Sequence, residues 1–353
     1  MKNKTLKSVF VLLICSSCSS IYRFSIDVQE PAKVTLPVSA QNVLILNNSV
    51  TQPKDFGIER MLNGQSIGTN FPLSLDTMVW SAVEEISAVL NESNFFKSIA
   101  VYRAPLRKDK EWLARVDLSP EVQSDFYGTE NFDALLVVNR LLFSVKENAK
   151  IIQTGAFTTE PLAFVDMRID GILSCSMYAY GKEKPLISFS VSDSLFVKYT
   201  VTNDSTILFK EIPEYALDAL SRRLGNQAAN YFIPTWKTSE RQIFTAYNSR
   251  MQEAAGYAAN RQWANAESVW IAEFGRKTNP VDKAKIAYNL AIATEMQDKF
   301  DSAWSWVLKA KDCLKEAGFD SYSQEMQLID KYISELELRI QNDRLLDLQW
   351  GKE

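Results

Sequence analysis

The chain has no histidine among its 353 residues, and this absence excludes several classes of catalytic site. A Ser-His-Asp triad or a Cys-His pair needs an imidazole to accept a proton, so neither can form. Zinc sites that use histidine ligands are excluded for the same reason. Catalysis by carboxylates or by a lysine stays open, but no motif in the chain points to it.

Cysteine is scarce, with 4 residues in the whole chain. Two of them, Cys15 and Cys18, lie near the N-terminus. The other two, Cys175 and Cys313, are too few and too far apart in sequence to hold zinc. Cys175 falls on the apolar side of a predicted strand, which favours a buried and unreactive thiol. We therefore expect no metal site and no cofactor.

A surplus of basic residues is also missing. The chain has 39 Lys and Arg against 43 Asp and Glu, and its formal net charge is -4. Because no basic block is present, we do not expect a nucleic acid as partner. Beyond Ile14 no apolar stretch is long enough to cross a bilayer.

The N-terminal residues form three successive segments. Met1–Lys7 is basic, Val9–Ile14 is a short apolar run, and small serines then lead to Cys18. This pattern resembles the signal sequence of bacterial lipoproteins. It departs from the family three positions before the lipidated cysteine, where leucine is usual and this chain has Cys15.

The resemblance implies that residues 1–18 are a signal peptide and that Cys18 carries the lipid. Cys18 is favoured over Cys15 because a serine precedes Cys18, whereas a bulky isoleucine precedes Cys15. Two or more acyl chains would anchor the protein stably to a membrane. An ordinary cleaved secretory signal is the alternative. Ser19–Arg23 are not acidic, unlike the same region of surface-exported Bacteroidetes lipoproteins, which favours the periplasmic face of the outer membrane.

Residues 19–41 contain two prolines among mixed polar residues and are predicted to be a tether, or alternatively an early edge strand. After them, Val43–Leu46 is a continuous apolar run that is typical of a buried strand. Further strands are predicted at Ile99–Tyr102 and from Ala134 onward. Apolar residues recur at helical spacing over residues 75–90 and again after Pro213, which predicts two helices.

A strong hairpin pattern lies between these helices. Residues 167–180 and 187–192 alternate apolar and polar side chains, and a turn at Gly181–Pro185 separates them. Cys175 lies on the apolar side, whereas Ser174 and Ser176 lie on the side expected to face solvent. We therefore predict that residues 42–236 form an α+β domain with helices on a mixed or antiparallel sheet.

The C-terminal part, residues 240–349, is predicted to be entirely helical and to contain an internal repeat. Trp263-x-x-Ala266-x-x-x-Trp270 recurs as Phe300-x-x-Ala303-x-x-x-Val307, an offset of 37 residues. This pattern resembles the tetratricopeptide repeat, whose period is about 34. The last helix carries an apolar stripe that would cap the end of the array. A coiled-coil seam is the alternative, although the stripe is short for one.

Taken together, the signal, the α/β domain and the repeat resemble uncharacterised Bacteroidetes-type envelope lipoproteins with a domain of unknown function. The resemblance implies location and architecture only. Our first hypothesis is a membrane-anchored interaction or scaffold protein in envelope assembly or maintenance. Because the chain has no histidine and no glycine-rich phosphate loop of the P-loop type, we expect it to have no enzymatic activity. Its partner, a protein or peptide, would bind the helical repeats, and Trp304 and Trp306 are the candidate contacts.

The alternative is a small-ligand-binding or hydrolytic α/β domain, with the repeats as a docking module. The polar segment 50–72 would then supply the site, because ligands often bind in loops beyond the carboxyl ends of strands. Its candidate residues are Asp55, Glu59 and Arg60.

Overall fold

The computed structural model describes residues 21–67, 75, 77–130, 132–152, 162–202, 212–245 and 248–352. The chain divides into two compact units. The α/β unit contains Glu30–Thr235 and Arg344–Glu353, and the helical unit contains Met1–Gln29 and Trp236–Asp343. Cys15 and Cys18 lie outside the described residues, so the lipid attachment stays a prediction. No helix in the described ranges is both long and apolar enough to cross a membrane.

The α/β unit alternates strands with three helices, in the order β2 (Asn42–Asn47), β3 (Ile58–Leu62), β4 (Gln65–Ile67), α1 (Met78–Glu92), β5 (Ser98–Pro105), α2 (Pro120–Glu130), β6 (Ala134–Ile152), β7 (Leu162–Ala179), β8 (Ile187–Thr202) and α3 (Glu214–Ala229). All these strands belong to one seven-stranded sheet. This architecture confirms the predicted α+β class.

Strand β6 is the centre of this sheet. Along one side it pairs antiparallel with β7, and β7 pairs antiparallel with β8. Along its other side, β6 pairs in parallel with β2 near its start and with β3 near its end. Strand β5 extends the sheet beyond β2, and β4 extends it beyond β3. The sheet is therefore mixed, and the predicted antiparallel hairpin is present as β7 and β8, with Cys175 opposite Phe189.

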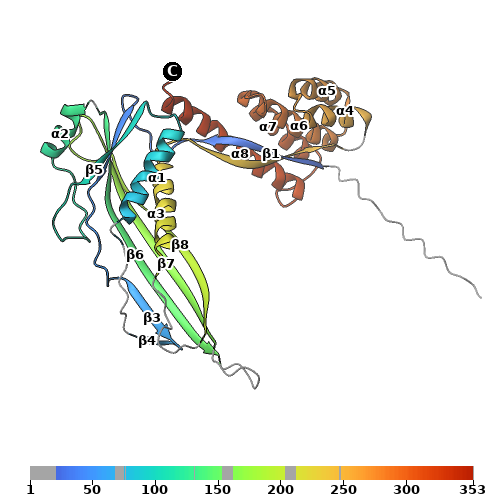
Figure 1. The fold of residues 1–353 in the computed structure, drawn as a ribbon. Coiled ribbons are helices and arrows are strands. Elements are labelled where there is room, and N and C mark those ends of the chain that lie inside the picture. Colours follow the sequence, from blue (N-terminus) through green and yellow to red (C-terminus); the bar gives the residue numbers. More distant parts are fainter. Residues whose placement is uncertain are drawn as a thin grey trace, which may run out of the picture. The chain divides into compact units, whose positions relative to one another are not determined.

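The main core lies between the sheet and two helices. Helices α1 and α3 lie side by side on one face of β6, β7 and β8 (Figure 1). Gly225 allows the close approach of α3 to α1, because a Cβ at this position would lie 2.5 Å from the carbonyl oxygen of Ala82. Cys175 is buried in this core, and burial raises the pKa of its thiol to about 12. The prediction of an unreactive cysteine agrees with this environment.

The alternation predicted that the opposite face of the sheet is exposed to solvent, but part of that face is covered. A smaller apolar cluster covers it near the start of β6, where side chains of Leu118, Phe132 and Tyr178 pack together. Ser174 and Ser176, expected on a solvent-exposed face, are buried. Their hydroxyls bond across the strands to Ser190 at 2.9 Å and to Ser188 at 2.8 Å, so they stay hydrogen-bonded when covered.

The described part of the helical unit contains the helices α4 (Ser249–Ala259), α5 (Trp263–Arg276), α6 (Pro280–Glu295) and α7 (Phe300–Glu316), and most of α8 (Gln324–Gln349). It also contains a two-stranded sheet of β1 (Ile21–Glu30) and β9 (Thr235–Phe244). The boundaries between the two units fall at the last residue of β1, at the first residue of β9 and within α8, between Asp343 and Arg344. The C-terminal run of helices agrees with the predicted fold class.

Two predictions about these strands need correction. The segment 19–41, predicted as a tether, contains β1, which matches the edge-strand alternative instead. The helical pattern expected from residue 240 begins only at Ser249, because β9 continues to Phe244. Most of β9 is polar, and its buried positions depend on partners far away in sequence, so no local apolar pattern marks it as a strand.

The internal repeat is visible in the turns that join the helices. Arg261 follows α4 and Asp298 follows α6, and they have φ values of 58° and 56°. In both turns the next residue donates its N–H to a carbonyl five positions back: Gln262 to Tyr257 and Lys299 to Thr294, each at 2.9 Å. The two turns are separated by the same offset as the sequence repeat. Ala266 and Ala303, the small residues of the repeat, are both fully buried.

Candidate functional site

Helix α6 is the centre of the helical unit. It is buried on nearly all sides, including the polar residues Asn289, Thr294 and Glu295. Buried polar groups need hydrogen-bond partners, and the buried residues of α6 find several of theirs in β9 and α8. Helix α6 is therefore in contact with β9 and α8 as well as with the neighbouring repeat helices.

Asn289 holds the backbone of β9. The N–H of Phe244 donates to Asn289 Oδ1 at 2.8 Å, and Asn289 Nδ2 donates to the carbonyl oxygen of Phe244 at 2.7 Å. The ring of Phe244 also packs edge-on against Tyr288, with centroids 5.5 Å apart. A side-chain amide that satisfies both groups of one residue holds an extended segment in a single position along the helix.

Glu295 lies at the end of α6, with 0% of its surface exposed. Arg241 of β9 binds it with two hydrogen bonds, from Nε to Oε2 at 2.9 Å and from Nη2 to Oε1 at 2.8 Å. Two side chains of α8 complete the set: Arg339 Nη1 donates to Oε1 at 2.6 Å and Tyr332 Oη donates to Oε2 at 3.0 Å. The buried carboxylate thus joins β9, α6 and α8.

The protonation states follow from this geometry. Burial alone would raise the pKa of Glu295, but the hydrogen bonds and charge of Arg241, followed by those of Arg339, hold that pKa below its ordinary value. Burial and the adjacent Glu295 carboxylate raise the pKa of Tyr332 well above its ordinary value. Tyr332 therefore stays a hydrogen-bond donor, and Glu295 stays charged at neutral pH.

A cavity of about 80 Å³ opens beside this cluster. Charged and aromatic side chains line it, among them Arg23, Arg241, Tyr288, Lys331, Tyr332 and Glu335. Pockets for small organic molecules usually measure about 300–1,000 Å³. This cavity has room for a few water molecules or a small ion.

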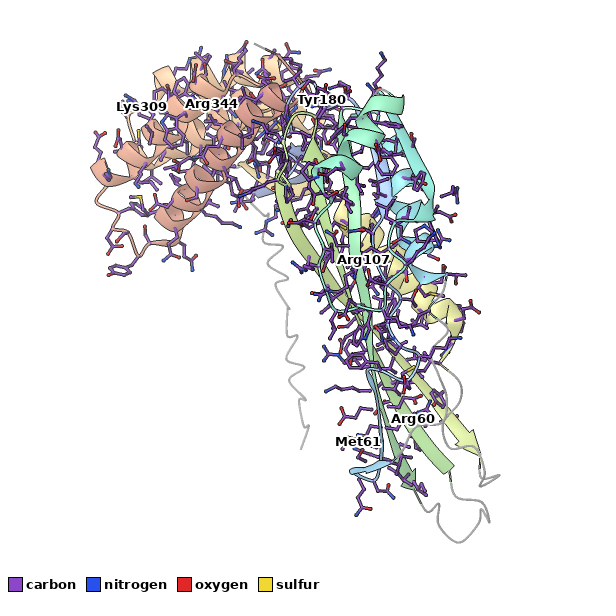
Figure 2. All side chains as sticks on the ribbon, turned by 90° about the vertical axis from the view of Figure 1, so that its left-hand side faces the viewer. Arg60, Met61, Arg107, Tyr180, Lys309 and Arg344 are labelled. Atoms are coloured by element: carbon purple, nitrogen blue, oxygen red, sulfur yellow. The ribbon has the colours of Figure 1, made fainter. Side chains whose placement is uncertain are left out.

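The structure separates the ligand-site residues predicted in segment 50–72. That segment is not one loop, because it contains β3 and β4. Arg60 of β3 is buried, with 2% of its surface exposed, and forms an ion pair with Glu147 of β6, which also accepts a hydrogen bond from Tyr199 at 3.2 Å. Figure 2 shows Arg60 and its neighbour Met61 on this part of the sheet.

Glu59 and Asp55 lie elsewhere. Glu59 is half-exposed and pairs with Lys146 at 3.5 Å, and Asp55 is exposed in the turn before β3. The three candidates therefore do not converge on a pocket. Of the described residues, no group of three or more Asp, Glu or Cys side chains is placed to hold a metal ion.

Trp304 and Trp306, predicted as partner contacts, are both half-buried and pack against the helical core. The ring of Trp306 meets Phe274 of α5 edge-on, with centroids 5.2 Å apart.

The sequence analysis did not predict roles for Asn289, Glu295 and Arg241. A lone polar residue in a helical pattern is interpreted as solvent-exposed unless its distant partner is known.

Comparisons with known proteins give a family for the α/β unit. A family model described as a domain of unknown function (DUF8603) matches residues 40–244, which is more than half of the chain. The chain belongs to this family. A second family model, also described as a domain of unknown function (DUF6340), matches residues 252–338 in the helical unit. No curated protein matches the sequence.

Solved bacterial structures give only distant likenesses. A PelC dodecamer from Paraburkholderia phytofirmans has a TM-score of 0.23 and 8% identity, and the match covers 59% of this chain and 96% of that one. A Xanthomonas campestris protein with the family model DUF330 has a TM-score of 0.19 and 9% identity, and the match covers 55% of this chain and 84% of that one. Lipoprotein GNA1162 from Neisseria meningitidis has a TM-score of 0.18 and 12% identity, and the match covers 54% of this chain and 98% of that one. TM-scores this low carry no information about function.

The ion cluster leads to a stability prediction. Arg241→Met removes the bidentate partner of a buried carboxylate, so we expect it to lower the free energy of unfolding by about 3–5 kcal/mol at neutral pH. Lys311→Met is the control, because Lys311 and Asp330 form a partly exposed pair in the same unit, and its expected cost is under about 1 kcal/mol. Urea unfolding of the full chain, followed by circular dichroism, measures both.

The pH dependence of this cost provides a second readout. A carboxylate whose pKa is lowered in the folded state stabilises the fold above its unfolded pKa, and that stability is lost as the pH falls through the folded value. The cost of Arg241→Met should therefore shrink as the pH falls below 4.5, the ordinary pKa of glutamate. Equal costs for Arg241→Met and Lys311→Met at neutral pH would contradict the importance of this pair.

Proposed function

We propose that this protein is a lipid-anchored interaction protein of the bacterial cell envelope. The basic, apolar and small-residue segments before Cys18 support the anchor, and the absence of acidic residues after it supports the periplasmic face of the outer membrane. We interpret α4–α7 as two tetratricopeptide-like repeats, because both turns share one hydrogen-bond pattern at the sequence offset. The protein would take part in envelope assembly or maintenance without catalysis.

The open edge of β8 is the observation that most favours binding of another polypeptide. Strand β8 pairs with β7 over 16 residues, and no other strand in the described parts of the chain pairs with it. An edge of this length presents unpaired N–H and C=O groups, to which a strand of another protein can add. Phe196 on this strand is 69% exposed, and the Arg168 guanidinium lies 5.5 Å from the centre of its ring.

The helical repeats offer a less open surface than expected. Stacked repeats usually bind partners along an extended concave face. Here β9 and α8 of the same chain already hydrogen-bond to α6. We therefore place the main partner contact at β8. The outer surfaces of α5 and α7, where Ile271 and Leu308 are exposed, are secondary contacts.

The anchor can be tested by cell fractionation. Cys18→Ala removes the predicted lipid attachment, so we expect the protein to move from the membrane fraction to the soluble fraction. Cys15→Ala is the control and should stay in the membrane fraction. Release by Cys15→Ala but not by Cys18→Ala would show that the lipid is on Cys15 and would contradict the assignment to Cys18.

The partner contact can be tested by site-specific cross-linking in native membranes. A photo-crosslinking residue in place of Phe196 should give a discrete cross-linked product with another protein, because this side chain lies on the open edge strand. The same residue in place of Tyr215, which is 71% exposed on α3, should not give that product. The same product from both positions, or none from Phe196, would argue against docking at β8.

A further inference from the structure

We propose that Arg115 and Arg140 form a binding site for a phosphate group on the face of the sheet opposite α1 and α3. The proposal does not rest on partner binding at the β8 edge, although Ser190 of β8 is part of the site, and the whole site lies in the α/β unit.

The floor of the site is one row of residues across three strands. Arg140 of β6 lies opposite Ser174 of β7, and Ser174 lies opposite Ser190 of β8. Directly opposite residues share a face of the sheet, so the three side chains stand next to one another. The row is polar throughout, and Ser174 and Ser190 bond to each other at 2.9 Å.

The second arginine comes from the segment between β5 and α2. Arg115 Nη2 donates to Ser174 Oγ at 3.0 Å and also to Ser190 Oγ. The same segment accepts a hydrogen bond from Arg140, whose Nη1 lies 2.8 Å from the carbonyl oxygen of Leu113. Both guanidinium groups therefore lie over the same row.

Arg107 holds the covering segment in place. Its guanidinium pairs with Asp109 at 2.6 Å and donates to the carbonyl oxygen of Ala114 at 3.1 Å, directly before Arg115. Figure 2 shows Arg107 beside the long strands. The backbone that carries Arg115 is thus fixed before any ligand arrives, which lowers the entropy cost of binding.

The charges of the two arginines are unbalanced. Eight arginines lie between β2 and the end of α3, and six of them form ion pairs with carboxylates: Arg60, Arg103, Arg107, Arg168, Arg222 and Arg223. Arg115 and Arg140 have no carboxylate partner in the part of the chain that the structure describes. Burial, together with the positive charge of Arg115, lowers the pKa of Arg140. An anion between them would relieve this repulsion.

Hydrogen-bond donors are also left over. Arg140 Nε is buried and bonds to no group of the described residues, and Arg115 Nε and Nη1 have no protein acceptor among them. Guanidinium groups bind phosphate oxygens in pairs through parallel N–H donors. Arg115 and Ser190 are exposed, so a phosphate group can reach the site from solvent. That group could belong to a free phosphate compound or to a lipid headgroup.

Titration of the full chain with inorganic phosphate tests the site, with sodium chloride matching the ionic strength. We use Cys18→Ala protein so that its own lipid does not interfere. Wild-type side chains at the site should give saturable binding, and Arg115→Gln and Arg140→Gln should each weaken it about tenfold or more, as expected for losing a charge-assisted hydrogen bond. Arg168→Gln is the matched control, because Arg168 lies on the same sheet but pairs with Asp170.

A second arm distinguishes the source of the phosphate group. Sedimentation with phosphatidic acid vesicles, compared with phosphatidylcholine vesicles, detects a lipid headgroup if free phosphate does not bind. Loss of either binding in Arg115→Gln and Arg140→Gln, but not in Arg168→Gln, supports the site. If Arg140→Gln does not fold, the exposed Arg115 decides alone. Absence of both kinds of binding, or equal losses in all three variants, would overturn the proposal.

Discussion

The helical unit depends on one buried carboxylate. Glu295 has no exposed surface, and a charged group in that position is stable only when hydrogen bonds and opposite charges replace its lost hydration. Arg241, Tyr332 and Arg339 supply these from β9 and α8. Because these partners come from two elements other than α6, the carboxylate fixes the extended β9 segment and the last helix on the repeat core.

This constraint determines what the repeats can offer to other proteins. With the Phe244 backbone held by Asn289, an extended segment of the same chain lies along α6. A partner that bound α6 in the same way would first have to displace β9. In the α/β unit the situation is different, since β8 ends the sheet with one side unpaired by any described strand. Our proposal therefore places the interaction surface on the sheet.

The sequence predicted the features that depend on local periodicity. Alternation gave the β7–β8 hairpin with Cys175 inside, and helical spacing gave α1 and α3. The repeat offset matched the two turns at Arg261 and Asp298. The features that the sequence did not predict depend on contacts between distant residues. Strand β9 is mostly polar, Arg60 is buried and pairs with Glu147 of a distant strand, and Ser174 is covered by a segment with no regular structure. None of these leaves a local pattern.

The central claim is that β9 is fastened along α6, and amide hydrogen exchange of the full chain tests it most directly. The Phe244 amide donates to Asn289, so it should exchange as slowly as core amides of α6, and Asn289→Ala should accelerate it while exchange in α1 and α3 stays unchanged. A Phe244 amide that exchanges in the unmodified protein as fast as an unstructured peptide would contradict this account.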